Sequence, residues 1–364
     1  MSNSRAERLI QNSTKVDKIV IVNGGEPFLD STFWYITGLS TGVFEGSMAF
    51  ISSDGTVDIL ISELEEEAAK NANANVHVYK TRKEALAMRK ELLGKAKRIG
   101  INSSSITYSS VQGLKKVNKD IKIFNVSKGI GRTVSVKDED EIRATEKACR
   151  ITSTVANELP SMIYEGASEK EIAAKMDDRM RKLGGTGNAF ETIAAFGQYS
   201  AECHHRPCDY KLKVGDAALF DFGSKYDMYC ADLTRTIFLG EPPDILKRAY
   251  EVVKEAQMAG IEKIRDGAKT YEPDRAARKV IDDSEFKGKF IHSFGHGIGM
   301  DVHQSISLTK KKTKEELKAG NIVSAEPGIY IPGVGGIRIE DTVLVTEDGC
   351  RILTSYDHEL TIVK

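Results

Sequence analysis

Three of the chain's seven histidines fall within a dozen residues, in a stretch that glycines interrupt. The stretch reads HSFGHGIGMDVHQ and covers residues 292–304. Spacings of four and seven would place His292, His296 and His303 on one side of a helix. The three glycines make a helix costly, so a strand or a tight loop is the better prediction. The imidazoles indicate a site for a metal ion, a substrate or both.

Four carboxylates occupy matching places in two related segments. LKVGDAALFD, which ends at Asp221, aligns without a gap with LKAGNIVSAE, which ends at Glu326. Farther along each segment, Asp232 in DLTRT and Glu340 in EDTVL precede a threonine by two residues. The chain therefore contains an internal repeat of two similar halves.

Each half is predicted to contain helices followed by a hairpin. Gly-Ala pairs at 166–167 and 267–268 each separate two long helical patterns. Turns are predicted near residues 226–227 and at Gly333, midway between the carboxylates of each half. The two carboxylates of a half should then lie roughly opposite each other on one face of paired strands. If a pseudo-twofold axis relates the halves, all four meet at one centre.

Four carboxylates in one pocket need cations. Like charges about 4 Å apart repel by about 4 kcal/mol per pair at an effective dielectric near 20. Two divalent ions would neutralise the four charges, and paired metals are a common hydrolytic arrangement. His296, between two glycines, is the best fifth ligand, and this donor set suits Mn, Co, Fe or Zn. A single Asp or Glu is more commonly a turn residue or the partner of an arginine, but the duplication favours a metal site.

The region before the repeat has an α/β pattern. Helices are predicted at 63–72 and 82–96, and the segment STFWYITGL, residues 31–39, resembles a strand. Six further strands are predicted at residues 18–23, 47–52, 56–62, 76–80, 98–102 and 121–126. No phosphate-binding glycine motif accompanies them.

A second domain is predicted to follow the sequence SKGIGRTVSVKDEDE. Ser135, with Asp138 three residues later, is typical of a capped helix start, and the helix should extend over 139–164. We expect domains at 1–132 and 133–364, and an α/β (α+β) fold overall.

Bulk composition narrows the function classes. The chain has 364 residues, of which 40% are hydrophobic and 29% charged, and its net charge is −1. This balance gives no electrostatic reason to expect nucleic acid or a membrane surface as a partner. The sequence shows neither a secretory signal nor an apolar run of about 18 residues, so a cytoplasmic protein is expected. Five cysteines without a CxxC pair argue against disulfides or a zinc finger.

A set of ordered motifs resembles a known family. SAECHH, FDFG followed by ADLTRT, HSFGHGIGMDVH, AEPGIY and GGIRIEDTVLVTEDG together resemble the Xaa-Pro dipeptidase (prolidase) and aminopeptidase P group. These are metallopeptidases with the creatinase-like, or pita-bread, fold. The resemblance implies a small creatinase-like N-terminal domain over 1–132 and a catalytic domain with a pseudo-twofold repeat over 133–364. It also implies a homodimer, in which the segment around Tyr35 could contact the other subunit.

The resemblance also implies a site. Five metal ligands carry over to Asp221, Asp232, His296, Glu326 and Glu340. The second and fifth of these would bridge two divalent ions per subunit, Mn or Co first, with Zn or Fe as alternatives. Catalytic histidines match His204 and His303, and His292 matches a third histidine of the pocket. His205, beside His204, is the less favoured of that pair.

The implied reaction is hydrolysis of the bond before proline by a hydroxide that bridges the two metals. Glu326 would move the proton of the water to the leaving nitrogen. His204 and His303 would hold the carbonyl oxygen. Arg338 would orient the bridging carboxylate Glu340 and, like His292, border the substrate; a structural ion pair is an equal alternative.

Three departures from the family pattern leave the substrate open. Gln304 follows His303 where an acid is usual, Cys203 replaces a proline, and SISLTKKKTKEE replaces a proline-bearing loop. Cys203 could be a nucleophile, although a buried thiol is the commoner case. No carboxylate-binding cation is evident, and the lysines at 310–314 are more typical of solvated surface.

Hydrolysis of Xaa-Pro dipeptides is therefore the first functional prediction. Release of the N-terminal residue from longer Xaa-Pro peptides is the second, and a non-catalytic interaction scaffold with the same fold is the third. Methionine aminopeptidases generally lack the N-terminal domain, and creatinase works without these metal ligands, so both are disfavoured.

Overall fold

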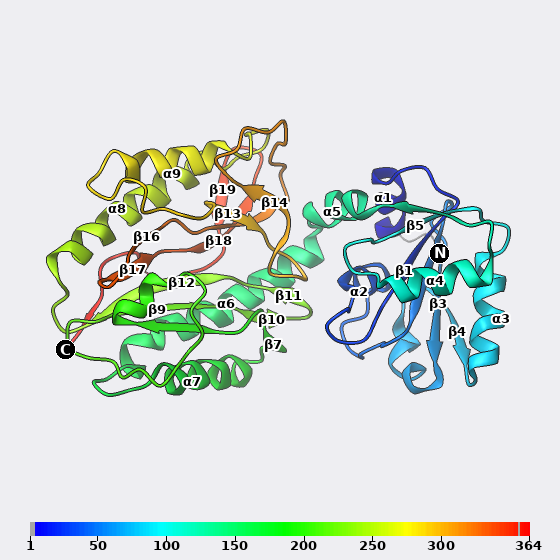
Figure 1. The fold of residues 1–364 in the computed structure, drawn as a ribbon, viewed down its shortest axis with the longest axis horizontal. Coiled ribbons are helices and arrows are strands. Elements are labelled where there is room, and N and C mark those ends of the chain that lie inside the picture. The colour runs from blue at the N-terminus through cyan, green and yellow to red at the C-terminus, as the bar shows by residue number, and fades with distance from the viewer. Residues whose placement is uncertain (1–3, 356) are drawn as a thin grey trace. The chain divides into compact units, whose positions relative to one another are not determined.

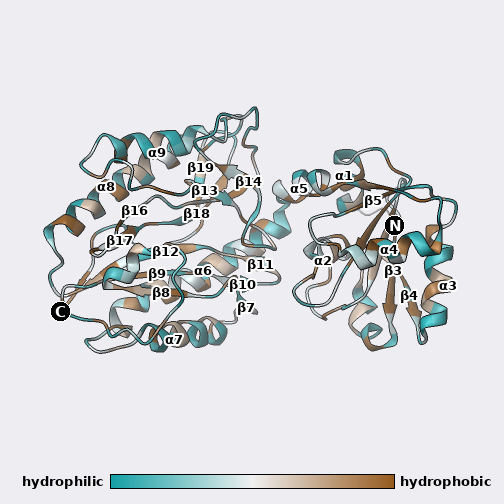
Figure 2. Ribbon diagram, viewed as in Figure 1, coloured by the Kyte–Doolittle hydropathy of each residue, from teal (hydrophilic) through white to brown (hydrophobic). Residues whose placement is uncertain are grey.

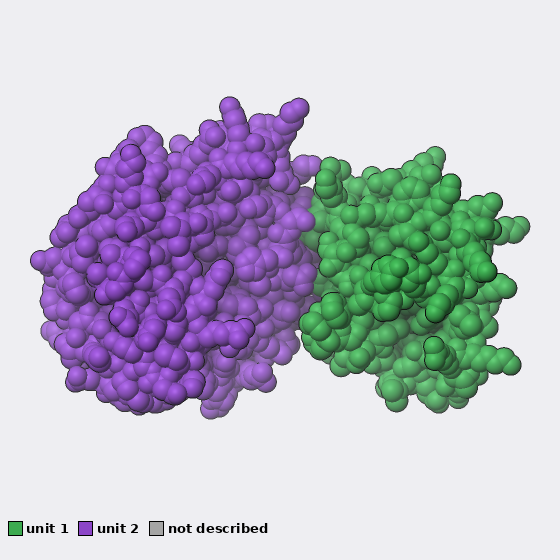
Figure 3. All heavy atoms as spheres, viewed as in Figure 1, with its two compact units in different colours: residues 1–134 green, residues 135–364 purple. Residues whose placement is uncertain are grey.

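The computed structural model describes residues 4–355 and 357–364. The chain divides into two compact units, residues 1–134 and 135–364 (Figure 3). Among the described residues, no helix combines the length and apolarity that crossing a membrane requires.

In the first unit, helices flank a mixed sheet with the strand order β4-β3-β2-β1-β5-β6 (Figure 1). Its strands are β1 (Lys18–Val22), β2 (Met48–Ser52), β3 (Val57–Ser62), β4 (Asn75–Tyr79), β5 (Arg98–Ile101) and β6 (Lys122–Asn125). Its helices are α1 (Ser4–Asn12), α2 (Ser31–Thr37), α3 (Arg82–Leu93), α4 (Tyr108–Val117) and α5 (Ser127–Ser135). Strand β3 is mainly hydrophobic, whereas α3 carries both apolar and polar residues, as a helix covering a sheet should (Figure 2). The six predicted strands are confirmed, and so is the helix predicted at 82–96, although it ends at Leu93.

Two predictions in this unit are wrong. Residues 31–37 form α2, because the side chain of Asp30 caps its N-terminus and Gly38 ends it at φ 69°. Tyr35 is buried in this unit, so its side chain is not available for a second subunit. Residues 63–72 form only two short 3₁₀ turns, η1 (Glu63–Glu65) and η2 (Ala68–Asn71), and the crowded glutamates disfavour a longer helix.

The second unit begins with α6 (Glu139–Met162). The side chain of Asp138 accepts a hydrogen bond from the backbone N–H of Glu141, and the carboxylate of Glu141 accepts one from the N–H of Asp138. The prediction of Ser135 as the cap is therefore wrong, since Ser135 is the last residue of α5. Asp138 directly precedes the helix and caps it as well as a serine would.

The internal repeat is confirmed by two sets of elements in the same order. The first set comprises α6, α7 (Glu169–Lys182), β8 (Ile193–Phe196), β9 (Ala217–Phe222) and β12 (Leu233–Leu239). The second comprises α8 (Asp244–Ile261), α9 (Glu272–Asp282), β13 (Gly295–Gly297), β15 (Ile322–Ala325) and β18 (Asp341–Val345). In each set the last three strands are antiparallel neighbours, in the orders β12-β9-β8 and β18-β15-β13.

The correspondence extends to single hydrogen bonds. Leu212 donates its N–H to the carbonyl of Ala167 at 2.9 Å, and Leu317 donates to Ala268 at 2.8 Å. In both halves, the Gly-Ala pair seen in the sequence therefore lies beside the leucine that precedes the first carboxylate strand.

Shorter strands extend these sheets. Strand β20 (Ile362–Val363) lies beside β12, while β14 (Gln304–Leu308) and β19 (Cys350–Ile352) border the second sheet. Strands β7 (Gly187–Asn188), β10 (Ser224–Tyr226) and β11 (Tyr229–Cys230) form a small sheet, and β16 (Gly328–Ile331) pairs with β17 (Gly335–Arg338). The 3₁₀ helix η3 (Gly197–Ala201) follows β8.

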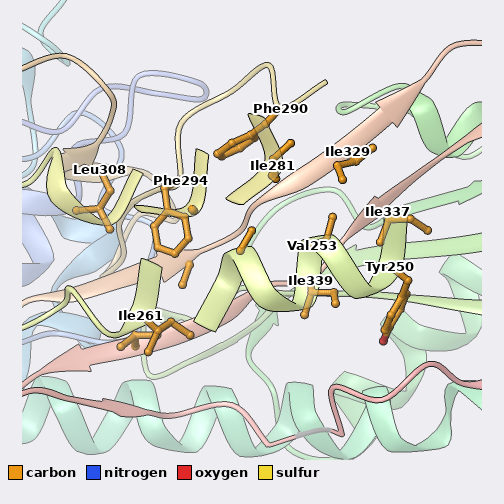
Figure 4. Close-up of a cluster of buried hydrophobic side chains, with 14 of the residues drawn as sticks. Tyr250, Val253, Ile261, Ile281, Phe290, Phe294, Leu308, Ile329, Ile337 and Ile339 are labelled. Carbon is orange, nitrogen blue, oxygen red and sulfur yellow. The ribbon is translucent and has the colours of Figure 1, made fainter. Parts of the chain in front are cut away.

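A hydrophobic core fixes the second half. Tyr250, Val253 and Ile261 of α8 pack with Ile281 of α9 and with strand residues, among them Ile337 of β17 (Figure 4). Burying side chains of this size contributes roughly 1.5–3 kcal/mol each. This packing holds the strands whose ends carry Glu326 and Glu340.

Candidate metal centre

The four predicted carboxylates lie at the ends of paired strands. Asp221 is in β9, Asp232 precedes β12, Glu326 follows β15 and Glu340 precedes β18. The strand pairing continues from Ala325 opposite Asp341, so Glu326 and Glu340 fall opposite each other as predicted.

The register of the first hairpin differs from the prediction by two residues. Asp221 lies opposite Thr234, so Asp232 is diagonal to it, on the same face. The reason is the turn, which consists of Asp227 and Met228 at φ 49° and 72°. Its centre lies one residue later than expected, and the strand partners shift by two.

His296 brings an imidazole to these carboxylates from β13. Its Nε2 lies 3.2 Å from Oε1 of Glu326 and 3.6 Å from Oδ2 of Asp232. One ligand atom each from Asp232, His296 and Glu340 lie within 4.8 Å of one another. Within the histidine-rich stretch only Gly295–Gly297 and the last residue, Gln304, lie in strands, and the rest forms loops, as its glycines indicated.

The glycines beside His296 allow close contact between strands. A Cβ atom at Gly295 would lie 2.0 Å from the carbonyl oxygen of Ser324, and one at Gly297 would lie 2.5 Å from that of Ser305. Larger residues would push β13 away from its neighbours. The glycines thus seat the strand, while the imidazole reaches the acidic cluster.

Three oxygens of the cluster are buried without a hydrogen-bond partner: Oδ1 of Asp221, Oδ1 of Asp232 and Oε1 of Glu340. An unsatisfied buried polar group costs about 1–3 kcal/mol, and a charged one costs more. Oxygens that lack donors but converge on one region are suited to a cation. The residues present therefore fit divalent metal ions, and carboxylates with one imidazole suit Mn, Co, Fe or Zn.

The pKa shifts of the carboxylates also favour a cation at this site. Burial, and then the charge of Glu340, raises the pKa of Asp232 well above its ordinary value. Burial, and then the charges of Glu326 and Asp221, does the same to the pKa of Glu340. Burial would also raise the pKa of Glu326, but the hydrogen bond and charge of His296 outweigh it, and that pKa is lowered. The cluster thus holds more negative charge than its surroundings compensate.

Arg338 supplies part of the missing positive charge. Its guanidinium donates to Oδ2 of Asp221 at 2.6 Å, to Oγ1 of Thr234 at 3.1 Å and to the hydroxyl of Tyr330 at 2.9 Å. Arg338 was expected to orient Glu340, but it pairs with Asp221 and reaches Glu340 only through Thr234, whose hydroxyl donates to Oε2 of Glu340.

An open cavity of about 450 Å³ leads to the cluster. It is lined by Cys203, His204, Asp221, Ile291, His292, Ser293, Gly295, His296, His303, Ser307, Glu326 and Arg338. The rings of His296 and His303 have centroids 3.9 Å apart. The lysines at 310–314 are not among these lining residues.

The two adjacent histidines have different environments. His204 is exposed to the cavity, whereas His205 is 8% exposed and contacts two glutamates. Two participants, Tyr330 and Thr234, were given no role in the site from the sequence. Tyr330, which bonds both Arg338 and Nε2 of His292, ends the motif AEPGIY, and Thr234 lies within DLTRT. The sequence signal for Tyr330 and Thr234 was their position within these motifs.

Comparison with known proteins identifies the family. A model of metallopeptidase family M24 matches residues 143–347, and one of the creatinase/prolidase N-terminal domain matches residues 8–133. The chain belongs to metallopeptidase family M24. Its catalytic unit accordingly has the pita-bread fold, and the resemblance noted in the sequence is confirmed.

Relatives in this family match nearly the whole of this chain. An Xaa-Pro dipeptidase of Pyrococcus horikoshii is 34% identical over 98% of this chain and 99% of its own. The solved X-Pro aminopeptidase of Thermotoga maritima has a TM-score of 0.90 at 32% identity and covers 99% of this chain and all of its own. The Xaa-Pro dipeptidase of Bacillus anthracis also has a TM-score of 0.90 at 32% identity, over 98% and 99% of the two chains.

Proposed function

We propose that this chain hydrolyses the peptide bond before proline in Xaa-Pro dipeptides and that it uses two divalent metal ions. The observation that carries the proposal is the set of buried carboxylate oxygens without donors, placed beside an imidazole at the end of a cavity. Relatives named Xaa-Pro dipeptidase, matched over nearly the whole chain, support the substrate class. Residues 133–364 would form the catalytic domain and residues 1–132 the creatinase-like N-terminal domain.

Five side chains would hold the metal ions: Asp221, Asp232, His296, Glu326 and Glu340. We propose Mn or Co as the metal, with Zn or Fe compatible with the same donors. When bound, a pair of such cations lowers the pKa of water and polarises a carbonyl group. Asp232 and Glu340, whose pKa values are raised, would release protons when they bind metal.

Glu326 would serve as the general base. Its lowered pKa keeps the carboxylate deprotonated near neutral pH, so it can accept a proton. The hydroxyl of Ser324 donates to its Oε1 at 3.0 Å and fixes its orientation. Glu326 would take the proton of the attacking water and deliver it to the nitrogen of the leaving proline.

His204 and His303 would hold the carbonyl oxygen as negative charge develops on it. Burial, and then the charge of His296, lowers the pKa of His303, so this imidazole is neutral near pH 7 and has one N–H to donate. His292 would border the substrate on the other side, oriented by Tyr330. Arg338 would contribute its charge at the cavity wall through its pair with Asp221.

The direct test compares the cleavage of dipeptides with that of longer Xaa-Pro peptides. Metal-loaded protein should cleave Xaa-Pro dipeptides such as Ala-Pro and leave Pro-Ala intact, while metal-depleted protein should cleave neither. Efficient cleavage of only longer Xaa-Pro peptides would favour the second candidate, aminopeptidase P-type activity, which the similarity to the Thermotoga X-Pro aminopeptidase supports. Inactivity in all forms would favour a binding scaffold. We also propose a homodimer, which sedimentation velocity would test.

A further inference from the structure

A buried carboxylate outside the metal centre binds both ends of one loop. Glu169 lies in the first turn of α7 and its side chain is fully buried. Its Oε1 accepts the N–H of Phe196 and its Oε2 accepts the N–H of Cys208, each at 2.8 Å. We call the segment between them, residues 196–208, the histidine loop.

The middle of the histidine loop is also held. Nε2 of His205 lies 2.8 Å from Oε2 of Glu169, and its Nδ1 lies 2.8 Å from Oε2 of Glu202. The ring of Tyr199 stacks on the imidazole, with centroids 5.1 Å apart. His205 is thus enclosed by a helix residue on one side and by its own loop on the other.

The contacts of His205 favour a ring protonated on both nitrogens. A carboxylate can only accept hydrogen bonds, so each ring nitrogen that faces one must carry a hydrogen. Burial alone would lower the pKa of His205, but the hydrogen bonds to Glu202 and Glu169 outweigh it, and the pKa is raised. The titratable groups around the ring are these two glutamates, Tyr199 and Cys208.

The same residues could be taken for a second metal site, because Glu169, His205 and Cys208 bring potential ligand atoms together. The distances argue otherwise. Two ligands at about 2.1 Å in tetrahedral geometry are separated by roughly 3.4 Å, whereas Nε2 of His205 and Oε2 of Glu169 lie 2.8 Å apart. That is the length of a charge-assisted hydrogen bond.

The histidine loop carries Cys203 and His204 to the wall of the cavity. It is also joined to β17, because Oγ of Ser200 accepts the N–H of Gly336 at 2.8 Å, two residues before Arg338. The position of His204 therefore depends on anchors on both sides, and His205 is the anchor next to it in sequence.

We propose that His205, held as an imidazolium between Glu169 and Glu202, is a positioning residue that fixes the histidine loop and thereby places His204 in the cavity. The inference rests on the proposed function, because it assigns a role to His204 in that reaction. When His205 loses its proton, one carboxylate loses its donor, and the loop should loosen. Activity should then decline at alkaline pH.

Two variants separate positioning from general stability. His205→Phe keeps a ring against Tyr199 but removes both donors. Its kcat should fall about 10- to 100-fold, as expected for a misplaced group, with metal content unchanged. Glu202→Gln changes a side chain that is 59% exposed, so folding is not at risk. Its alkaline limb of kcat/KM should move to lower pH, because the imidazolium has lost one of its two anions.

The matched control is His77→Phe. His77 also contacts a carboxylate, Oδ1 of Asp58 at 2.9 Å, but lies on β4 of the first unit. Its kcat and pH profile should equal those of the unchanged protein. An unshifted alkaline limb in Glu202→Gln would overturn the proposal.

A readout without substrate keeps this test distinct from that of the proposed function. Histidine-labelled protein would be titrated by NMR, and the signals of His205 would be assigned by their loss in His205→Phe or His205→Gln. The proposal expects an imidazolium at pH 7 whose pKa falls in Glu202→Gln. A neutral ring at pH 7 in an active enzyme would overturn this inference alone. Absence of peptidase activity with the imidazolium present would instead contradict the proposed function.

Discussion

Thr234 donates a hydrogen bond of 2.6 Å from its Oγ1 to Oε2 of Glu340, a residue of the other half of the repeat. The equivalent threonine of the second half also bonds across the repeat. Oγ1 of Thr342 donates to the backbone carbonyl of Asp232 at 2.7 Å. The first half thus holds the carboxylate of Glu340, and the second half holds the backbone of Asp232. The duplicated threonines make the geometry of the centre depend on the contact between the halves.

Thr234→Val should weaken metal binding. Valine keeps the shape and removes the donor to Glu340, so metal affinity should fall about 10- to 100-fold. Isothermal titration of metal-depleted protein with Mn²⁺ would measure this. Thr154→Val is the control, at an exposed site on α6 where the threonine hydroxyl donates to the carbonyl of Arg150. Equal affinity in Thr234→Val and the unchanged protein would show that Thr234 does not support the ligand.

Removal of Arg338 should destabilise the protein. Its guanidinium is almost wholly buried and pairs with Asp221, so Arg338→Met leaves a buried carboxylate without its cation. The expected loss in free energy of unfolding is about 3 kcal/mol in metal-free protein, measured by urea denaturation. Arg351→Met breaks an exposed pair with Glu146 and should cost less than about 1 kcal/mol. Similar losses in both variants would contradict the assigned role.

The stability of metal-free protein should depend on pH in an unusual direction. The pKa values of Asp221, Asp232 and Glu340 are raised, chiefly by burial. An acid with a raised pKa contributes stability that is complete below its unfolded pKa, near 4, and is lost as pH rises through the folded pKa. Glu326, whose pKa is lowered, acts in the opposite direction. Metal-free protein should therefore lose stability as pH rises from about 4.

Metal binding should reverse this trend by releasing protons. Titration calorimetry at pH 6 in buffers of different ionisation enthalpy should detect about one proton or more per chain. No release at that pH would mean that the carboxylates are already ionised without metal.

The cavity histidines should affect catalysis and leave the metal in place. His204→Ala and His303→Ala each remove a donor to the carbonyl oxygen, so kcat for an Xaa-Pro dipeptide should fall about 10²- to 10³-fold. Metal content, measured by elemental analysis, should equal that of the unchanged protein. Loss of metal in His204→Ala would show that this residue supports metal binding and would contradict its assigned role at the substrate.

The sequence predicted the site better than the details around it. Asp221, Glu326 and their repeated partners could be found because duplication places equivalent residues at equivalent strand ends. The exact register could not be predicted, because it depends on whether the turn is centred between Tyr226 and Asp227 or between Asp227 and Met228, which the backbone conformation decides.

Other features depended on contacts between residues distant in sequence. The aromatic and β-branched residues of 31–37 favour a strand locally, but the caps at Asp30 and Gly38 produce a helix. The pairing of Glu169 with His205 spans 36 positions and has no local signal. Arg338 was singled out, but its choice of Asp221 over Glu340 is settled by Thr234 lying between them.

The central claim, that five side chains from two duplicated halves hold two cations, is tested most directly by metal stoichiometry. Metal-depleted protein would be titrated with Mn²⁺ and the bound metal counted per chain, for the unchanged protein and for Glu340→Gln. The account predicts two ions per chain in the former, with dipeptidase activity restored as they bind, and fewer than two in the latter. A chain that binds no Mn²⁺, or binds the same amount after Glu340→Gln, would contradict it.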